Sequence, residues 1–258
     1  MTGTLQLATH QRESRRVWLR PIQRVAAPRL RLVCFPHAGG AASFYRGWPE
    51  WLAPDVEAGA VRYPGREDRI LEPCIDTMAE LADRIAEALA PSLDRPLVLF
   101  GHSMGASVAH EVALRLEARF GPVVARLIVS CRAAAPRLRP RGISGWSDAQ
   151  LLAHLRSLGG DVSAVLEHPE MRDVLLPAIR SDYRLTDAYT ARTPVPLTAP
   201  VTGYLGEDDP HVTEEDMRAW STATRGDFTL NVLPGDHFYL LPQAARVVTE
   251  IGELTAGI

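Results

Sequence analysis

The chain has 258 residues, of which 46% are hydrophobic and 23% are charged, and its formal net charge is -3. This length suffices for one large α/β domain with a substantial core, and the balanced charge without a basic run argues against electrostatic binding of nucleic acid. We find no signal-peptide core and no apolar stretch long enough to span a bilayer, so we expect no membrane partner and a cytoplasmic location.

Strands and helices alternate along the first half of the chain. Residues 1–13 look disordered. In chain order we predict an edge strand at 17–19, strands at 30–35 and 56–61, helices at 44–52 and 78–89, a strand at 96–100, a helix at 104–119 and a strand at 127–130. Such alternation predicts parallel βαβ units and an α/β fold with a mostly parallel sheet.

The stretch 136–200 breaks this rhythm, because it contains no convincing strand. It holds two amphipathic segments, 147–158 and 170–189, joined by Gly159-Gly160. We expect residues 136–199 to form a helical lid over the carboxyl end of the sheet, and the alternative is a helical decoration without a gating role. The core would then comprise 14–135 and 200–258.

The remaining elements complete the core. We predict a strand at 201–205, a helix at 214–222, a last strand at 228–233 and a closing helix at 243–255.

The sequence Gly101-His102-Ser103-Met104-Gly105 lies between a buried strand and an amphipathic helix. Gly-x-Ser-x-Gly in this context is typical of a nucleophile elbow, a sharp turn that projects the serine hydroxyl away from the sheet. The glycines are needed where a side chain would collide with the strand or the helix. The motif therefore predicts a serine hydrolase with Ser103 as nucleophile.

A serine hydroxyl needs a base beside it and a carboxylate that orients the base. His237 follows the last predicted strand, and Asp209 follows the preceding one, which gives the chain order Ser, Asp, His. Asp208 is the competitor for Asp209, one residue away. Asp236 is adjacent to His237, so we expect it to point elsewhere.

Two backbone N–H groups are expected to form an oxyanion hole. One belongs to Met104, just after the nucleophile, and the other to Ala38, in the small-residue loop that follows the strand at 30–35. Losing one such donor typically costs about 100- to 1000-fold in rate.

We expect mainly structural roles for the other polar residues. We expect His102 to support the elbow and His37 to shape its loop or line the pocket. Arg62, Arg66, Glu67 and Asp68 favour a loop-stabilising ion cluster over a substrate site. The remaining histidines, His10, His110, His154, His168 and His211, are expected at surface or structural positions.

The cysteines give no sign of a metal or cofactor site. Cys34, Cys74 and Cys131 lie far apart without a CxxC spacing, so we expect neither a metal site nor a disulfide framework, and no bound cofactor.

Four motifs together resemble the type II thioesterases, the stand-alone α/β-hydrolases associated with polyketide synthases and nonribosomal peptide synthetases. In order they are Phe35-Pro36-His37-Ala38-Gly39-Gly40, Tyr63-Pro64-Gly65-Arg66-Glu67, Gly101-His102-Ser103-Met104-Gly105 and Gly235-Asp236-His237-Phe238. The resemblance extends from about residue 29 to 254 and includes 176–183 in the expected lid. Asp236 departs from the usual glycine, and the lid entry at 142–146 is atypical.

The resemblance implies an α/β-hydrolase fold and a substrate, an acyl group in thioester linkage to the phosphopantetheine arm of a carrier protein. It implies a housekeeping role, in which Ser103, His237 and Asp209 release stalled or incorrect acyl groups from a synthase. We expect a monomer. A small-molecule carboxylesterase of the same fold, and an inactive hydrolase fold that binds a synthase, are the alternatives.

Overall fold

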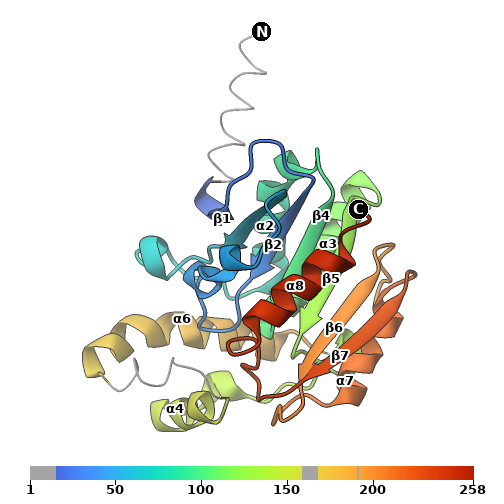
Figure 1. Ribbon diagram of the computed structural model, residues 1–258. Helices are drawn as coiled ribbons and strands as arrows, with labels where there is room; N and C mark the ends of the chain where they lie inside the picture. The colour runs from blue at the N-terminus through green and yellow to red at the C-terminus, as the bar shows by residue number, and fades with distance from the viewer. Residues whose placement is uncertain (1–15, 159–167, 191) are drawn as a thin grey trace.

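The computed structural model describes residues 16–158, 168–190 and 192–258 (Figure 1). The expected disorder at 1–13 and the expected joint at Gly159-Gly160 lie outside the described residues.

One seven-stranded sheet, in the order β1-β3-β2-β4-β5-β6-β7, organises the described residues. Its strands are β1 Leu19–Gln23, β2 Leu30–Phe35, β3 Val56–Val61, β4 Leu97–His102, β5 Val124–Ser130, β6 Val201–Gly206 and β7 Phe228–Leu233. Only the edge strand β1 is antiparallel, to β3, and every other pair is parallel. The central strands β4 and β6 are buried along their whole length, as expected for strands covered on both faces.

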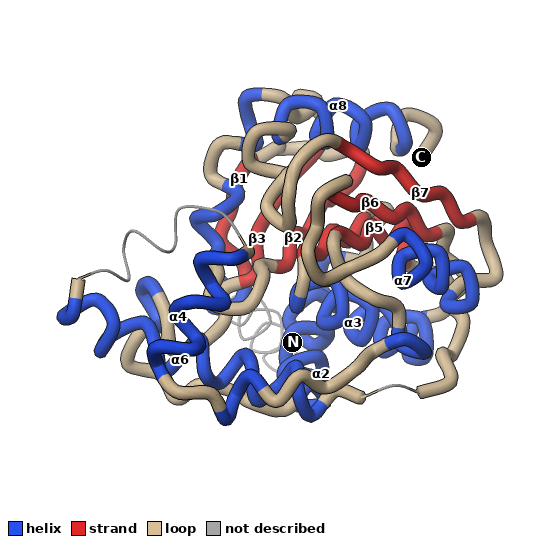
Figure 2. The backbone as a smooth tube through the Cα atoms, turned by 90° about the horizontal axis from the view of Figure 1, so that it is seen from below, coloured by secondary structure: helices blue, strands red, loops and turns tan. Residues whose placement is uncertain are grey.

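Helices cover both faces of the sheet, which agrees with the predicted α/β fold with a mostly parallel sheet. Helix α8 lies on one face, and α2, α3 and α7 lie on the other (Figure 2). Their bounds are α2 Met78–Leu89, α3 Met104–Phe120, α7 Glu214–Arg218 and α8 Ala244–Leu254. In α2 the apolar residues at helical spacing, which predicted the helix, are also its buried residues. They form the face that packs on the core.

Several predicted elements differ in their bounds, and β5 begins at Val124, three residues before the strand predicted at 127–130. The edge strand begins at Leu19, where a strand was expected to end. The helix expected at 44–52 is two 3-10 turns, Ala42–Tyr45 and Trp48–Glu50, and Pro49 stands at the start of the second. Helix α7 ends at Arg218 and continues as a 3-10 helix over Ala219–Ala223. Short stretches with proline or few residues do not sustain the α-helical hydrogen-bond pattern.

The stretch between β5 and β6 contains α4, Asp148–Ser157, and α6, Pro169–Ala188. Both helices lie beyond the carboxyl ends of the strands, at the bottom of Figure 1. Both helices contribute to a second hydrophobic cluster, which we call the lid cluster: Ile143, Leu151, Leu152, Leu155, Leu158, Leu176, Ile179, Tyr183 and Phe238. Leu185 of α6 instead packs in the main core. That this stretch acts as a lid stays a prediction. Within the described residues, no helix combines the length and apolarity that a bilayer crossing requires.

Candidate active site

Ser103 stands at the junction of β4 and α3 with the backbone angles φ 54° and ψ -122°. A positive φ is rare and costly for a residue with a side chain, so the surrounding structure must enforce it. The Ser103 N–H donates to the Ser130 carbonyl of the neighbouring strand at 2.8 Å. The hydroxyl thereby stands at the positive end of α3, clear of the sheet.

The two glycines of the elbow are required by close backbone approach. A Cβ on Gly101 would lie 2.3 Å from the Gly105 carbonyl oxygen, and a Cβ on Gly105 would lie 2.0 Å from the Phe35 carbonyl oxygen. Real Cβ atoms do not approach backbone this closely, so the turn cannot form with larger residues. This agrees with the reason given for both glycines from the sequence.

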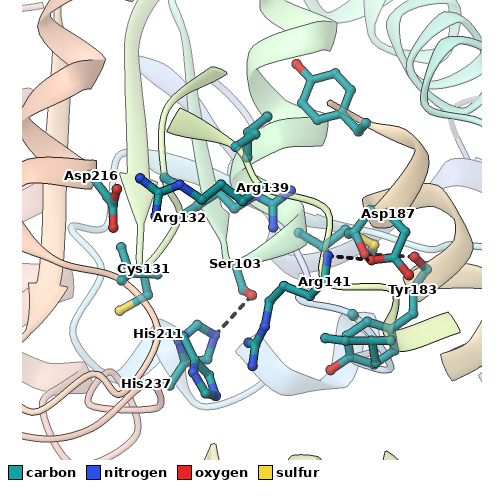
Figure 3. A pocket seen from close by; sticks show the side chains of 18 of the residues that line it. Ser103, Cys131, Arg132, Arg139, Arg141, Tyr183, Asp187, His211, Asp216 and His237 are labelled. Carbon is teal, nitrogen blue, oxygen red and sulfur yellow. Dashed lines mark hydrogen bonds between the residues drawn. The ribbon is translucent and has the colours of Figure 1, made fainter. Parts of the chain in front are cut away.

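Three side chains from three loops meet at this turn. The Ser103 hydroxyl lies 3.0 Å from Nε2 of His237, where its proton can be donated to the ring (Figure 3). The other ring nitrogen, Nδ1, donates to Oδ2 of Asp209 at 2.7 Å. The remaining oxygen of Asp209, Oδ1, accepts the N–H groups of His211 and Val212 at 2.9 and 3.1 Å. The carboxylate is thus held from both sides and aligned on the imidazole.

The two competing carboxylates lie elsewhere. Asp208 is exposed, and its N–H donates to the Gly235 carbonyl at 2.9 Å. Asp236 accepts the Phe238 N–H at 2.8 Å and closes its own turn. The arrangement therefore brings Asp209, and neither neighbour, to His237.

Burial and hydrogen bonding act in opposite directions on the Asp209 carboxyl. Burial raises its pKa, but the hydrogen bond and positive charge that His237 can supply, with the backbone N–H of His211, lower it more, so the net pKa lies below its usual range. Asp209 consequently stays ionised and can stabilise an imidazolium on His237.

Two further histidines lie beneath His237 without acting as bases. Burial lowers the pKa of His37 to about 3 and that of His102 well below its usual value, so both rings stay neutral. His102 bonds the Ser130 hydroxyl through Nδ1 at 2.9 Å, and the Ser130 carbonyl accepts the Ser103 N–H, so this hydrogen bond supports the elbow as expected. His37 packs its ring edge-on against Phe44 and Phe238 and so shapes its loop.

The two expected oxyanion donors open on the same cavity as the nucleophile, since Ala38, Met104 and Ser103 all line it. Among the described residues, neither N–H donates to a protein acceptor. The loop of Ala38 is a tight turn, closed by the Gly40 N–H to the His37 carbonyl at 2.9 Å. Free, preoriented N–H groups beside a nucleophile are what a developing oxyanion requires.

The cavity has a volume of about 350 Å³ and lies between the sheet and the lid. Tyr183, Leu158 and Ile143 line it from the lid side, and its charged lining is Arg132, Arg137, Arg139, Arg141, Asp187 and Asp216 (Figure 3). His154 and His211 also line it, with ring centroids 5.2 Å apart. Both were expected at surface or structural positions. The sequence around each histidine contains no pattern that indicates a cavity, because the cavity forms only when distant segments meet.

The charged cluster around the Tyr-Pro-Gly turn is only partly local. Arg62 pairs with Asp68, and Glu67 pairs with Arg20. Arg66 leaves the cluster, because its guanidinium bonds both carboxylate oxygens of Asp182 on α6 at 2.7 and 2.8 Å. The interpretation as a loop-stabilising cluster therefore fails for Arg66, whose partner lies in the lid.

Cys131 lies beside Asp209 and His237, with the potential ligand atoms of all three within 4.8 Å of one another. Asp209 and His237 already hydrogen-bond each other through these atoms. We therefore interpret the three residues as a packed hydrogen-bonded group and not as a set of metal ligands. Burial raises the pKa of the Cys131 thiol. Cys131 is therefore a neutral neighbour of the carboxylate.

Comparison with known proteins places this geometry in context. The thioesterase domain family matches residues 30–255. The chain is 41% identical over 236 residues to a Streptomyces griseus protein named "probable cadicidin biosynthesis thioesterase", covering 92% of this chain but 65% of that protein. It is 40% identical over 239 residues to thioesterase PikA5 of Streptomyces venezuelae, covering 92% of this chain and 85% of PikA5.

Solved structures agree with the sequence relatives. The type II thioesterase BorB from the borrelidin biosynthetic cluster superposes with a TM-score of 0.84 at 39% identity, covering 92% of this chain and 97% of BorB. The RedJ thioesterase from the prodiginine pathway of Streptomyces coelicolor gives 0.81 at 38% identity, with 91% of each chain covered.

Proposed function

The chain belongs to the thioesterase family, and from that premise we propose that it hydrolyses acyl thioesters carried on the phosphopantetheine arm of a carrier protein. In this role it releases stalled or incorrect acyl groups from a polyketide or nonribosomal peptide synthase. The observation that carries the proposal is the continuous chain of hydrogen bonds from Ser103 through His237 to Asp209.

The roles of the site residues follow from that geometry. His237 Nε2 takes the proton of the Ser103 hydroxyl as Oγ attacks the thioester carbonyl carbon. Asp209 keeps Nδ1 protonated, so that Nε2 is the free acceptor, and its charge stabilises the imidazolium. The N–H groups of Ala38 and Met104 receive the charge that develops on the carbonyl oxygen.

The second half of the reaction uses the same groups. Collapse of the tetrahedral intermediate breaks the carbon–sulfur bond, and the imidazolium supplies the proton to the departing thiol. Water then gives its proton to His237 and attacks the acyl-serine, which releases the acid and restores the Ser103 hydroxyl. A thiol leaves more readily than an amine, so this site needs less leaving-group assistance than a protease.

The acylated carrier protein is the partner that this proposal requires, and no cofactor takes part beyond the arm carried by the substrate. We further propose that the enzyme acts as a monomer in the cytoplasm. Support for the partner comes from a relative named as a biosynthesis thioesterase and from the type II thioesterase BorB of a biosynthetic cluster. Static light scattering of the purified protein tests the monomer.

The test is acyl release from a carrier protein. Wild-type enzyme and Ser103→Ala are each incubated with carrier protein loaded with acetyl, butyryl and octanoyl groups, and intact-protein mass spectrometry follows the loss of the acyl mass. We expect release by the wild type alone. Equal release by both proteins would contradict the proposal.

Two additional measurements separate the alternatives. A carboxylesterase would show a much higher kcat/KM on free esters than on carrier-bound acyl groups. An inactive synthase-binding fold would leave Ser103 unlabelled by a fluorophosphonate probe.

A further inference from the structure

One ion pair holds the loop that carries Ala38. Besides bonding both oxygens of Asp182, the Arg66 guanidinium donates from Nη1 to the Gly40 carbonyl at 3.0 Å. Oδ2 of Asp182 in turn accepts the Gly39 N–H at 2.7 Å. Asp182 and Arg66 therefore hydrogen-bond the backbone of Gly39 and Gly40, the two residues that directly follow Ala38.

The pair is buried, with side-chain exposures of 6% for Arg66 and 4% for Asp182. Removing two charges from water is costly, and a buried pair recovers that cost only with good geometry and additional hydrogen bonds. Here the geometry is bidentate, and the additional hydrogen bonds go to the loop backbone. A contribution to folding stability therefore does not explain why this pair is buried here. Its hydrogen bonds to the loop backbone indicate instead that it fixes the conformation of the loop.

A second contact brings the same lid helix onto the loop. Gly39 has φ +76°, and a Cβ there would lie 2.9 Å from Cγ1 of Ile179, one turn before Asp182 on α6. Residues three apart on a helix share a face. The backbone of Gly39 is consequently packed against α6 by Ile179 and hydrogen-bonded to it by Asp182.

We propose that Asp182, aligned by Arg66, is a positioning residue for the oxyanion hole. By holding the Gly39 amide it fixes the peptide plane next to Ala38 and hence the direction in which the Ala38 N–H points over Ser103. The inference rests on the proposed function, since it assumes that Ala38 stabilises an oxyanion. It makes the seating of α6 part of transition-state stabilisation, so that the lid does more than cover the cavity.

Asp182→Asn tests this role, because it preserves size and removes the charged acceptor. The Ala38 N–H is then misdirected, not removed, so we expect kcat to fall about 10- to 100-fold. KM should change less than about threefold, since Asp182 does not line the cavity. The measurement is steady-state hydrolysis of an acyl-pantetheine thioester.

Asp76→Asn is the matched control, because Asp76 also holds α6 but does not line the cavity. Nε of Arg184 on α6 donates to Oδ2 of Asp76 at 3.2 Å in an exposed pair, so the substitution removes a contact of α6 with the core and leaves the Ala38 loop untouched. We expect kcat within about twofold of wild type. Equal losses in both variants would show a general loosening of the lid and would overturn the proposal.

A fluorophosphonate provides a readout that does not depend on the natural substrate. Ser103 Oγ bonds to phosphorus, fluoride departs, His237 takes the hydroxyl proton, and the phosphoryl oxygen occupies the oxyanion hole. We expect the labelling rate of Asp182→Asn to fall by the same factor as kcat. The pH dependence of labelling should stay unchanged, because His237 and Asp209 are not altered.

Arg66→Lys is the second variant, since an ammonium keeps the charge but cannot bridge both Asp182 oxygens and the Gly40 carbonyl. We expect its labelling rate to fall about 3- to 30-fold, and circular dichroism checks folding of both variants. Unchanged labelling in the folded variants, or failure of both to fold, would identify the pair as a structural anchor and contradict the proposal. Wild type that labels but releases no carrier-bound acyl group would instead contradict only the proposed function.

Discussion

The sheet and the lid hold their parts of the site by different physical means. Ser103 is positioned by backbone geometry, through a positive φ and two glycines that admit no Cβ. The lid reaches the site through side chains, with Asp182 on the Ala38 loop and Asp187 on the lid entry. The nucleophile is therefore held by backbone geometry, whereas the loop that carries Ala38 is held by side chains of α6.

This difference predicts where the protein can change shape. Backbone constraints inside a buried strand cannot relax without unfolding the sheet, but side-chain pairs can separate while both helices persist. We expect the sheet to keep Ser103, His237 and Asp209 together in every state of the lid. The four predictions below test that contrast.

The largest effect is expected within the sheet half of the site, at Asp209. Asp209→Asn leaves the shape intact but favours the wrong tautomer of His237, so kcat should fall on the order of 10³- to 10⁴-fold. Asp208→Asn, an exposed neighbour, is the matched control and should stay within about twofold. Steady-state kinetics measures both, and a loss at Asp208 comparable to that at Asp209 would refute the assignment.

Among the substitutions that add a single methyl group, Gly105→Ala should lower the free energy of unfolding the most. Its Cβ would meet the Phe35 carbonyl oxygen, a backbone atom that cannot move aside. We expect the free energy of unfolding to fall by more than about 4 kcal/mol, beyond the usual range for one substitution. Gly145→Ala, where a Cβ meets nothing within 4 Å, is the lid control. Urea denaturation measures both, and a small loss at Gly105 would show that the elbow can relax.

Two buried leucines compare the hydrophobic clusters. Leu99 belongs to the main core and Leu151 to the lid cluster, and both are 0% exposed. Leu99→Ala should lower the free energy of unfolding by about 2–4 kcal/mol. Leu151→Ala should cost less than half of that, because we expect the lid cluster to come apart without unfolding the sheet.

Hydrogen exchange shows where each truncation acts. Leu151→Ala should speed exchange of the α4 amides and leave β4 protected, whereas Leu99→Ala should speed exchange throughout the sheet. Faster exchange of β4 in Leu151→Ala would mean that lid and sheet unfold as one unit.

The same contrast explains what could be predicted from the sequence. The elbow was recognisable because its motif is local, within the five residues from Gly101 to Gly105, although Gly105 is required by its close approach to the Phe35 carbonyl of β2. The sheet was equally accessible, since its parallel strands are short apolar runs between amphipathic helices. Chain order indicated His237, but Asp208 and Asp209 share one local pattern, and only the folded turn after β6 separates them.

The lid contacts could not be predicted in the same way. Arg66 and Asp182 are 116 residues apart, and Arg66 stands among nearer carboxylates, Glu67 and Asp68, that offer a local explanation. The amphipathic pattern predicted a helical segment at 170–189, and the family resemblance included 176–183, but neither gave a partner for Asp182. A pairing between distant elements leaves no periodicity or spacing in the chain, so only the folded molecule reveals it.

The smallest effect concerns titration in the core. His110 on α3 is buried edge-on to Trp220, and burial lowers its pKa to about 3. The unfolded chain takes up a proton near pH 6.5 that the folded chain does not, so stability is lost as pH falls below that value. Between pH 7.5 and 5 this amounts to about 2 kcal/mol for one such histidine.

His110→Phe and His110→Gln both abolish this titration while differing in packing. Between pH 7.5 and 5, we therefore expect the free energy of unfolding to fall by about 2 kcal/mol less in each variant than in the wild type, whatever the stability of the variant at pH 7.5. Urea denaturation at the two pH values gives the comparison. An unchanged pH dependence would mean that His110 is hydrated in the folded protein, and that the core beneath α3 is looser than its packing implies.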